Sequence, residues 1–109
     1  MSYDVSIGCF DDNYTSNMSG LFYSHIDGGL LSLDGLTGRA ASALLDCFWQ
    51  SVHSEYVRLW DGTTPGAVAF CAKYDSKNGW GSTVGALIFM AKITSACSAN
   101  PRHKLRVSS

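Results

Sequence analysis

The sequence predicts an α+β fold in which the two ends of the chain pair in one small antiparallel sheet and helices pack on it. Residues 3–9 and 104–108 both alternate apolar and polar side chains, as a strand with one buried face does. Between these ends, residues 37–53 and 82–99 have helical periodicity. Two strands alone are marginally stable, so we expect the helices to supply most of the core.

The chain has 109 residues, which is enough for one hydrophobic core, and we expect a single domain over residues 1–109. No internal repeat, low-complexity tract or linker divides it. Hydrophobic residues make up 46% of the chain and charged residues only 16%. A surface with so few charges favours contact with a protein partner or with a second copy of the chain.

The N-terminal strand is expected over residues 3–10, where Asp11, Asp12 and Asn13 favour a turn that ends it. The C-terminal strand places Lys104 and Arg106 on one side. If the two strands pair, Asp4 is expected near one of these cations, in an exposed ion pair worth ~0.5 kcal/mol.

Three short segments lie outside the long helices. A short helix is expected over residues 21–26, with Asn17 or Ser19 as its N-cap. Residues 30–33 are too few for their periodicity to indicate a helix or a strand. Residues 67–74 contain several alanines, which favours a helix over a strand.

Thr37 is the expected N-cap of the first long helix, because its hydroxyl can accept a hydrogen bond from a free backbone amide. The helix is expected to end near His53, with residues 55–60 as a continuation. Pro65, within residues 62–66, breaks the chain after it. The apolar stripe of the helix comprises Ala40, Leu44, Phe48 and Val52, and it is widened by Ala41, Leu45 and Trp49.

The second long helix is expected to begin after Ser82 or Thr83 as its N-cap. It is apolar on most sides, so we expect it to lie between the first helix and the sheet. Asn100, in a left-handed conformation, and Pro101 are expected to end it.

The cysteines at positions 9, 47, 71 and 97 are far apart in the sequence, and none has a histidine at ligand spacing. Their neighbours are mostly apolar. We therefore expect reduced cysteines that pack as small hydrophobic side chains, rather than disulfides or a metal site. No cofactor or metal is expected.

The net charge of −1 argues against a general nucleic-acid binder, which needs an excess of Lys and Arg to neutralise phosphates. No basic segment leads into an apolar segment after Met1, so no signal peptide is predicted. The longest apolar stretch, residues 84–91, is too short to cross a bilayer. We expect a cytoplasmic protein without membrane contact.

Catalytic residue patterns are weak. His25, His53 and His103 fall in different predicted elements, and no serine or cysteine lies in a motif such as GxSxG. His25 is interpreted as structural. The adjacent carboxylates of Asp11 and Asp12 would diverge if the strand continued. We therefore expect a protein without enzymatic activity.

The first candidate binding segment is residues 13–17. It offers amides, hydroxyls and a phenol, which suit recognition of a polar ligand or a protein partner. The structural alternative is a turn whose side chains bond to their own backbone. The candidate contact residues are Asn13, Tyr14, Thr15 and Asn17.

The second candidate segment is residues 75–81, where two glycines flank Trp80 just before a helix. Backbone amides there could hold an anion, and the indole could stack on a base or a partner side chain. The segment lacks P-loop spacing. In the structural alternative, Trp80 folds back into the core. The candidate contact residues are Asp75, Lys77, Asn78 and Trp80.

A third cluster contains Arg102, His103, Lys104 and Arg106. Two interpretations stay open: a patch for an acidic partner, and a solvated strand edge that blocks aggregation.

The order of short landmarks resembles a diffuse group of small, largely uncharacterised proteins of bacteriophages and actinobacterial genomes. The resemblance spans nearly the whole chain, and none of its motifs is catalytic. It implies a phage or prophage source and a role in binding a host protein, including defence machinery such as CRISPR effectors. The landmarks are Ser2-Tyr3-Asp4, Asn13-Tyr14-Thr15-Ser16-Asn17, Asn78-Gly79-Trp80-Gly81, Ala99-Asn100-Pro101 and Arg106-Val107-Ser108.

The leading hypothesis is a phage-encoded, non-enzymatic protein that binds and inhibits or modulates a host protein complex, with contacts near Tyr14 and Trp80. One alternative is a small-molecule or nucleotide binder with a pocket lined by Asn17, Tyr14 and Trp80 and a cation from Lys77 or Arg102. Another is a self-assembling structural or accessory protein, and a homodimer is compatible with the sparse charge.

Overall fold

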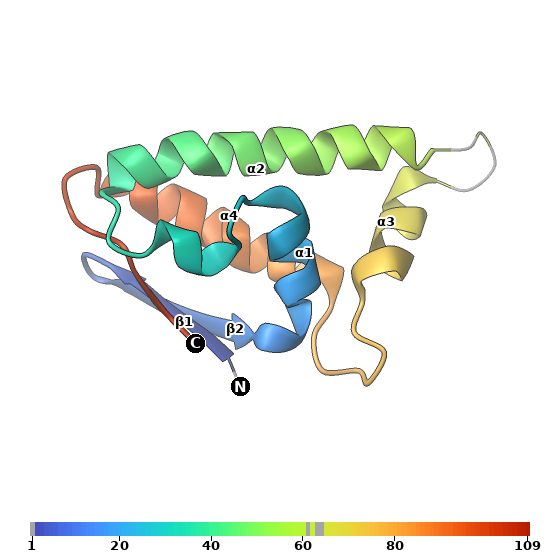
Figure 1. Ribbon diagram of the computed structural model, residues 1–109, viewed down its shortest axis with the longest axis horizontal. Helices are drawn as coiled ribbons and strands as arrows, with labels where there is room; N and C mark the ends of the chain where they lie inside the picture. The colour runs from blue at the N-terminus through green and yellow to red at the C-terminus, as the bar shows by residue number, and fades with distance from the viewer. Residues whose placement is uncertain (1, 61, 63–64) are drawn as a thin grey trace.

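In a computed structural model, which describes residues 2–60, 62 and 65–109, the chain forms one α+β domain. A three-stranded antiparallel sheet is covered on one face by helices, and the longest helix, α2, lies farthest from the sheet (Figure 1). The elements are β1 (Ser2–Ile7), β2 (Phe10–Thr15), α1 (Ser19–His25), α2 (Gly38–Arg58), α3 (Gly66–Tyr74), α4 (Thr83–Ala99) and β3 (Arg106–Ser108), with 3-10 helices η1 (Ser16–Met18) and η2 (Leu30–Leu33).

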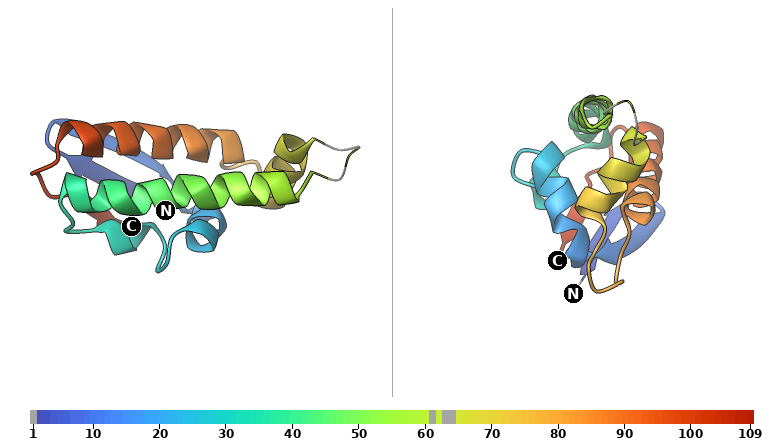
Figure 2. Two further views of the ribbon diagram at one scale, coloured as in Figure 1. Left: turned by 90° about the horizontal axis from the view of Figure 1, so that it is seen from above. Right: turned by 90° about the vertical axis from the view of Figure 1, so that its right-hand side faces the viewer.

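The predicted pairing of the two chain ends is confirmed. The strand order is β2-β1-β3, and Val5 lies opposite Val107 in an antiparallel register. The two termini therefore lie side by side in each view of the molecule (Figures 1 and 2). The buried side chains of β1 are Tyr3, Val5 and Ile7, as the alternation predicts.

The predicted turn at Asp11, Asp12 and Asn13 is wrong, because these residues lie within β2. The chain reverses earlier, at Gly8 and Cys9, where Gly8 adopts a positive φ of 57°. Asp11 and Asn13 lie on the open face of the sheet, where polar side chains remain hydrated. Asp12 faces the helices and forms an ion pair with Lys92 of α4 at 3.7 Å.

The predicted ion pair of Asp4 is not formed. Asp4 lies opposite Ser108, and Arg106 lies opposite Ser6. In the described part of the chain, no ion pair joins Asp4 to a cation. Lys104 precedes β3, and its backbone forms an isolated antiparallel β-bridge with Thr37.

The predicted caps of the first short helix are wrong. Asn17 lies in η1, and α1 begins at Ser19 after Met18, which has no side-chain capping bond. Leu30 and Leu33 of η2 are buried in the core. The expected helix over residues 67–74 is confirmed as α3.

Helix α2 begins as predicted, with the hydroxyl of Thr37 accepting a hydrogen bond from the amide of Ala40 at 3.2 Å. The helix includes part of the expected continuation and ends at Arg58. Its buried face lies on the widened side of the predicted stripe, because Ala40 and Leu44 are exposed whereas Ala41 and Leu45 are buried. The buried apolar side chains are Ala41, Leu45, Phe48 and Val52. In the predicted break at 62–66, residues 63 and 64 lie outside the described residues.

Helix α4 begins after Ser82, whose hydroxyl accepts a hydrogen bond from the amide of Gly85 at 3.0 Å. It packs between α2 and the sheet as predicted, but one face stays open, with Val84 and Ile88 more than half exposed. Asn100 has a φ of −129°, so the predicted left-handed cap is not formed. Its side-chain amide instead donates to the carbonyl of Ala96 at 2.8 Å.

The prediction that the cysteines pack as small hydrophobic side chains holds fully only for Cys97, which is buried. Cys71 is half-buried, while Cys9 in the hairpin turn and Cys47 on α2 are exposed. All four are free thiols. Burial raises the pKa of the Cys97 thiol, which keeps it protonated and unreactive.

Candidate functional site

The two segments that the sequence singled out meet in the structure, although 57 or more residues separate them in the chain. The hydroxyl of Tyr14 accepts a hydrogen bond from the amide of Ser82 at 3.0 Å and donates to the carbonyl of Ser82 at 3.2 Å. The side-chain amide of Asn17 donates to the carbonyl of Trp80 at 3.0 Å. The end of β2 and the residues after it therefore support the chain that leads into α4.

The Tyr14 side chain makes contacts within the protein, so it is not free to contact a partner. Its ring stacks on Phe89 of α4, with ring centroids 5.7 Å apart. Gly85 allows its close approach, because a Cβ at this position would lie 2.2 Å from the Tyr14 hydroxyl oxygen. The missing side chain at Gly85 makes room for the phenol that holds the start of the helix.

The other candidates in residues 13–17 have separate places. Asn13 lies on the open face of the sheet, on the opposite side of β2 from Tyr14. Thr15 accepts a hydrogen bond from the amide of Asn17 at 3.2 Å and packs against Gly81. The structural alternative for this segment therefore holds in part: one of its side chains bonds to local backbone, and two others hold the distant Trp80 segment.

We call residues 75–82 the Trp80 loop. Asn78 accepts a hydrogen bond from the amide of Trp80 at 2.9 Å, while Asn17 binds the carbonyl of the same residue. The backbone of Trp80 is thus fixed on both sides. Its side chain is 73% exposed, so the alternative in which Trp80 folds back into the core is wrong.

Asp75 joins the Trp80 loop to the first residue of α4. Its carboxylate accepts a hydrogen bond from the amide of Thr83 at 2.7 Å, and this bond lowers the pKa of the Asp75 carboxyl. The amides of Thr83 and Gly85 are both bonded within the chain, so they are not available to hold an anion. Lys77 is exposed on the same loop.

A second polar cluster lies where α1, α2 and α3 meet, around Glu55, the only glutamate of the chain. Glu55 is 6% exposed. Its carboxylate accepts a hydrogen bond from the hydroxyl of Tyr74 at 3.0 Å and pairs with Lys73 at 3.1 Å. Nε2 of His25 lies 3.3 Å from the same carboxylate, and Nδ1 of His25 lies 2.7 Å from the hydroxyl of Ser51.

The surroundings within this cluster shift the pKa values of His25 and Glu55. Burial lowers the pKa of His25, and the charges of Lys73 and Arg58 add to this against the attraction of Glu55. Burial alone would raise the pKa of Glu55, but hydrogen bonds from Tyr74 and Lys73 outweigh it and lower the pKa. At neutral pH the cluster therefore contains a neutral imidazole beside a carboxylate.

The series Ser51, His25 and Glu55 has the residue types of a hydrolytic triad, but its surroundings are those of a core. The imidazole is 2% exposed and has the rings of Phe48 and Phe70 as neighbours, at centroid distances of 6.2 and 5.9 Å. Both His25 and Glu55 are buried, so their side chains present almost no surface to solvent. We interpret the cluster as a set of polar contacts that stabilises the packing of α1, α2 and α3.

Sequence reasoning interpreted His25 as structural but missed its partners, because they lie 26 to 49 residues away in other elements. The one available signal was Glu55 itself, which occupies the apolar face of a helix at the spacing of Phe48 and Val52.

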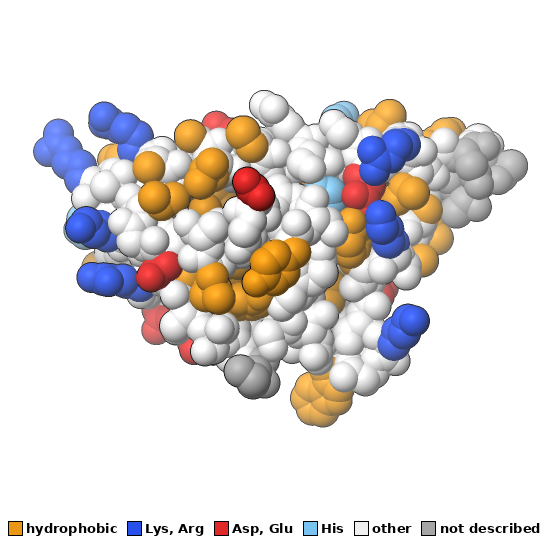
Figure 3. Space-filling view, in the orientation of Figure 1, with side chains coloured by type: hydrophobic (Ala, Val, Ile, Leu, Met, Phe, Trp, Pro, Cys, Tyr) orange, Lys and Arg blue, Asp and Glu red, His pale blue; other side chains and the backbone are white. Residues whose placement is uncertain are grey.

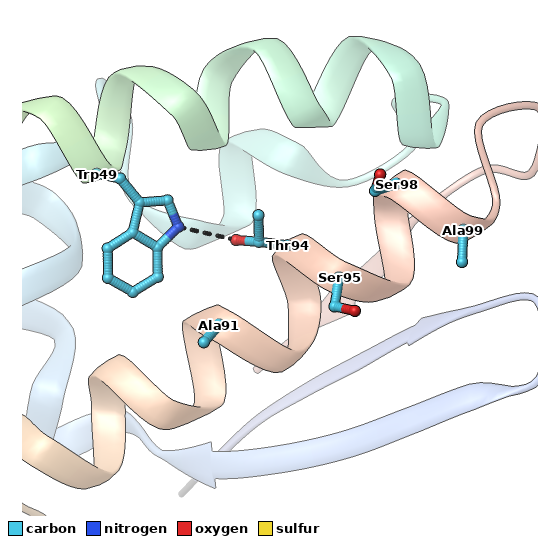
Figure 4. Close-up of a pocket in the computed structure, with 6 residues that line it drawn as sticks. All are labelled: Trp49, Ala91, Thr94, Ser95, Ser98 and Ala99. Atoms are coloured by element: carbon cyan, nitrogen blue, oxygen red, sulfur yellow. Dashed lines mark hydrogen bonds between the residues drawn. The ribbon is translucent and has the colours of Figure 1, made fainter.

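An open groove of about 590 Å³ runs between α2 and α4 on another side of the molecule (Figure 4). Trp49 reaches from α2 to α4, where its indole nitrogen donates to the hydroxyl of Thr94 at 3.0 Å. The floor is made by small side chains of α4. The lining residues are Trp49, Ala91, Thr94, Ser95, Ser98 and Ala99.

Comparison of the chain with protein families, with curated proteins and with solved structures finds no match in any of the three. In the described part of the chain, no helix has the length and apolar character of a membrane span. The same residues contain no group of three or more His, Cys, Asp or Glu side chains placed to hold a metal ion.

Proposed function

We propose that this protein is a non-enzymatic binding protein that contacts a protein partner through the Trp80 loop. The observation that carries the proposal is the combination of a 73% exposed indole with a backbone that is hydrogen-bonded on both sides. An exposed side chain alone is common, whereas an exposed tryptophan held in one place by the fold is typical of an interface anchor.

The energetics favour this use of Trp80. Burying a tryptophan in a partner removes on the order of 150–250 Å² of surface from water. Because the loop is already ordered by Asn17, Asn78 and Asp75, binding costs little additional conformational entropy. Lys77 adds one exposed cation to the same loop, which favours a partner with an apolar pocket and a nearby carboxylate.

The partner that we propose is a host protein or complex in the cytoplasm, in keeping with the phage and actinobacterial resemblance. Two landmarks of that resemblance, residues 13–17 and 78–81, are in direct contact at the Trp80 loop. Inhibition of host defence machinery such as a CRISPR effector is the specific role proposed.

The test makes the same substitution, tryptophan to alanine, at two different exposed positions. Trp80→Ala removes the proposed anchor, and Trp60→Ala removes a 57% exposed tryptophan two residues after the end of α2. Tagged wild-type and variant proteins capture partners from host lysate, and the captured proteins are compared by quantitative mass spectrometry. Circular dichroism and thermal unfolding verify that both variants remain folded.

We expect a protein that wild type and Trp60→Ala retain and Trp80→Ala loses. Reconstitution with that purified protein should then give a Kd that rises at least about tenfold in Trp80→Ala, the effect of an interface anchor. Equal capture by Trp80→Ala and wild type would contradict the assignment of the contact to this loop.

A further inference from the structure

Cationic side chains from two distant parts of the chain gather at one end of the molecule. The amide of Arg39, in the first turn of α2, donates to the carbonyl of Pro101 at 3.0 Å, and the preceding amide of Gly38 donates to the carbonyl of His103 at 2.8 Å. The backbone of Thr37 forms an isolated β-bridge with that of Lys104. We call Arg39, Arg102, His103 and Lys104 the basic end.

The contact between the two segments is tight. A Cβ at Gly38 would lie 2.2 Å from the carbonyl oxygen of Asn100 and 2.5 Å from that of Cys97. This close approach keeps the start of α2 against the end of α4. The basic end is therefore a fixed feature of the fold rather than a chance approach of surface loops.

The charges of the basic end are not neutralised. Within residues 2–60, 62 and 65–109, neither Arg39, Arg102 nor Lys104 forms an ion pair, and all three are exposed. Figure 3 shows Lys and Arg side chains gathered at the end of the molecule where Figure 1 places the start of α2. Arg106 differs, because it shares a shallow pocket with the carboxylates of Asp4, Asp11 and Asp34.

The groove between α2 and α4 reaches the last turn of α4, and the basic end follows this turn in the chain. Ser98 and Ala99 line the groove, and Arg102 follows them by a few residues. Trp49 marks the other end of the groove (Figure 4). Arg39 and Trp49 are ten residues apart on α2, which is about 15 Å along the helix axis. The residues of the basic end do not line the groove, but they adjoin the end of α4 that does, so cations, then hydroxyls and then an indole follow one another along this surface.

We propose that this site binds a nucleotide, with its phosphates at the basic end and its base against Trp49. Exposed Arg and Lys side chains complement phosphate oxygens. Aromatic rings stack on bases of any sequence, and the hydroxyls of Ser95 and Ser98 can bond to the sugar or the base. The lining of the groove contains no carboxylate that would repel phosphate.

The site is independent of the Trp80 loop. Trp80 precedes the first residue of α4 and Arg102 follows its last, so a helix of 17 residues separates them, about 25 Å at the usual rise per residue. A single protein can therefore hold a nucleotide and a protein partner at the same time.

Binding is measured by isothermal titration calorimetry with ATP, with inorganic tripolyphosphate and with a hexathymidylate oligonucleotide. Tripolyphosphate reports on the phosphates alone, and the oligonucleotide distinguishes a free nucleotide from one within a single strand. The variant Arg39→Gln/Arg102→Gln removes two charges from the basic end. The control Arg58→Gln/Lys77→Gln removes two charges elsewhere, from exposed positions on α2 and the Trp80 loop.

We expect wild type to bind ATP or the oligonucleotide more tightly than tripolyphosphate, and more tightly as salt is lowered. The Arg39→Gln/Arg102→Gln variant should lose at least about tenfold in affinity, since charge-assisted bonds are lost. Trp49→Leu should remove the advantage of ATP over tripolyphosphate. The control variant and Trp80→Ala should bind like wild type, which separates this site from the proposed protein contact.

Three results would overturn the proposal. The first is no detectable heat with ATP or the oligonucleotide at millimolar concentration in low salt. The second is an equal loss of affinity in the Arg58→Gln/Lys77→Gln control, which would indicate attraction without a site. The third is equal affinity of wild type for ATP and tripolyphosphate, which would exclude a role for the base and Trp49.

Discussion

The hydroxyl of Tyr14 and the backbone of Ser82 are hydrogen-bonded in both directions, at 3.0 and 3.2 Å, across 68 residues of sequence. This relationship joins the edge strand β2 to the N-cap of α4. Ser82 also caps the helix through its own hydroxyl, so one residue carries three of the contacts that hold the Trp80 loop in place.

Tyr14→Phe tests the importance of this relationship. The phenylalanine retains the ring stacking on Phe89 but leaves the amide of Ser82 without its partner, so we expect the free energy of unfolding to fall by about 1–2 kcal/mol. Partner binding through the Trp80 loop should weaken as the loop loses order. The measurements are chemical denaturation and partner affinity. Tyr23→Phe, at an exposed residue, is the matched control, and equal losses in both variants would argue against a special role for Tyr14.

Gly85→Ala tests the close approach of the phenol to α4. An alanine Cβ would lie 2.2 Å from the Tyr14 hydroxyl oxygen, so Tyr14 must move and the protein should be destabilised by about 1–3 kcal/mol. Gly20→Ala in α1 is the control, since nothing lies within 4 Å of its Cβ position and alanine favours a helix. We expect Gly20→Ala to be neutral or slightly stabilising. Thermal unfolding of both variants decides, and a stable Gly85→Ala would show that the approach is not close in solution.

The stability of the protein should fall as the pH drops through the titration of His25. Burial lowers its pKa in the folded state, so below about pH 6.5 the unfolded chain binds a proton that the folded chain does not. Stability contributed by the neutral imidazole is present above pH 6.5 and is lost below it. Chemical denaturation at pH 7.5, 6.5 and 5.5 measures this slope.

His25→Gln should reduce that slope, whereas His103→Gln, at an exposed position outside the cluster, should retain it. A wild-type slope in the His25→Gln variant would assign the pH dependence to another group.

Glu55→Gln should destabilise the junction of α1, α2 and α3. The variant leaves Lys73 without its carboxylate and weakens the bond from Tyr74. Because Lys73 is half-exposed and can be hydrated, we expect a loss of about 1–3 kcal/mol rather than the larger cost of an isolated buried charge. Asp46→Asn, at an exposed position on the same helix, is the control for the loss of one negative charge.

Glu55 should also add a second step, at lower pH, to the pH dependence of the free energy of unfolding. Its pKa is lowered in the folded state, so its contribution is present above the unfolded pKa near 4.5 and is lost as the pH falls below it. A Glu55→Gln variant with the stability and acid transition of wild type would exclude this role.

Much of the fold was predictable from local patterns. The alternation at both ends predicted the β1–β3 pairing, and the side chains of Thr37 and Ser82 predicted the start of both long helices. The strand β2 could not be predicted, because Asp11 and Asn13 have turn preferences. They are tolerated in a strand because one face of the sheet is open to water.

The candidate site was predictable as two segments but not as one place. Residue types around Tyr14 and Trp80 indicated polar contacts, yet the geometry that joins them depends on Gly85 and on the packing of α4 against β2. The basic end was visible in the sequence only through Arg102 and its neighbours. Arg39 joins them through tertiary contacts that no local pattern encodes.

The most direct test of the central claim is site-specific photocrosslinking from position 80. The photoreactive amino acid p-benzoylphenylalanine replaces Trp80 in one protein and Trp60 in another, and both are irradiated in host lysate. We expect one discrete crosslinked adduct from position 80 that excess unlabelled wild-type protein removes, and no such adduct from position 60. An adduct from position 60 alone, or no competed adduct from position 80, would contradict the assignment of the Trp80 loop as the contact surface.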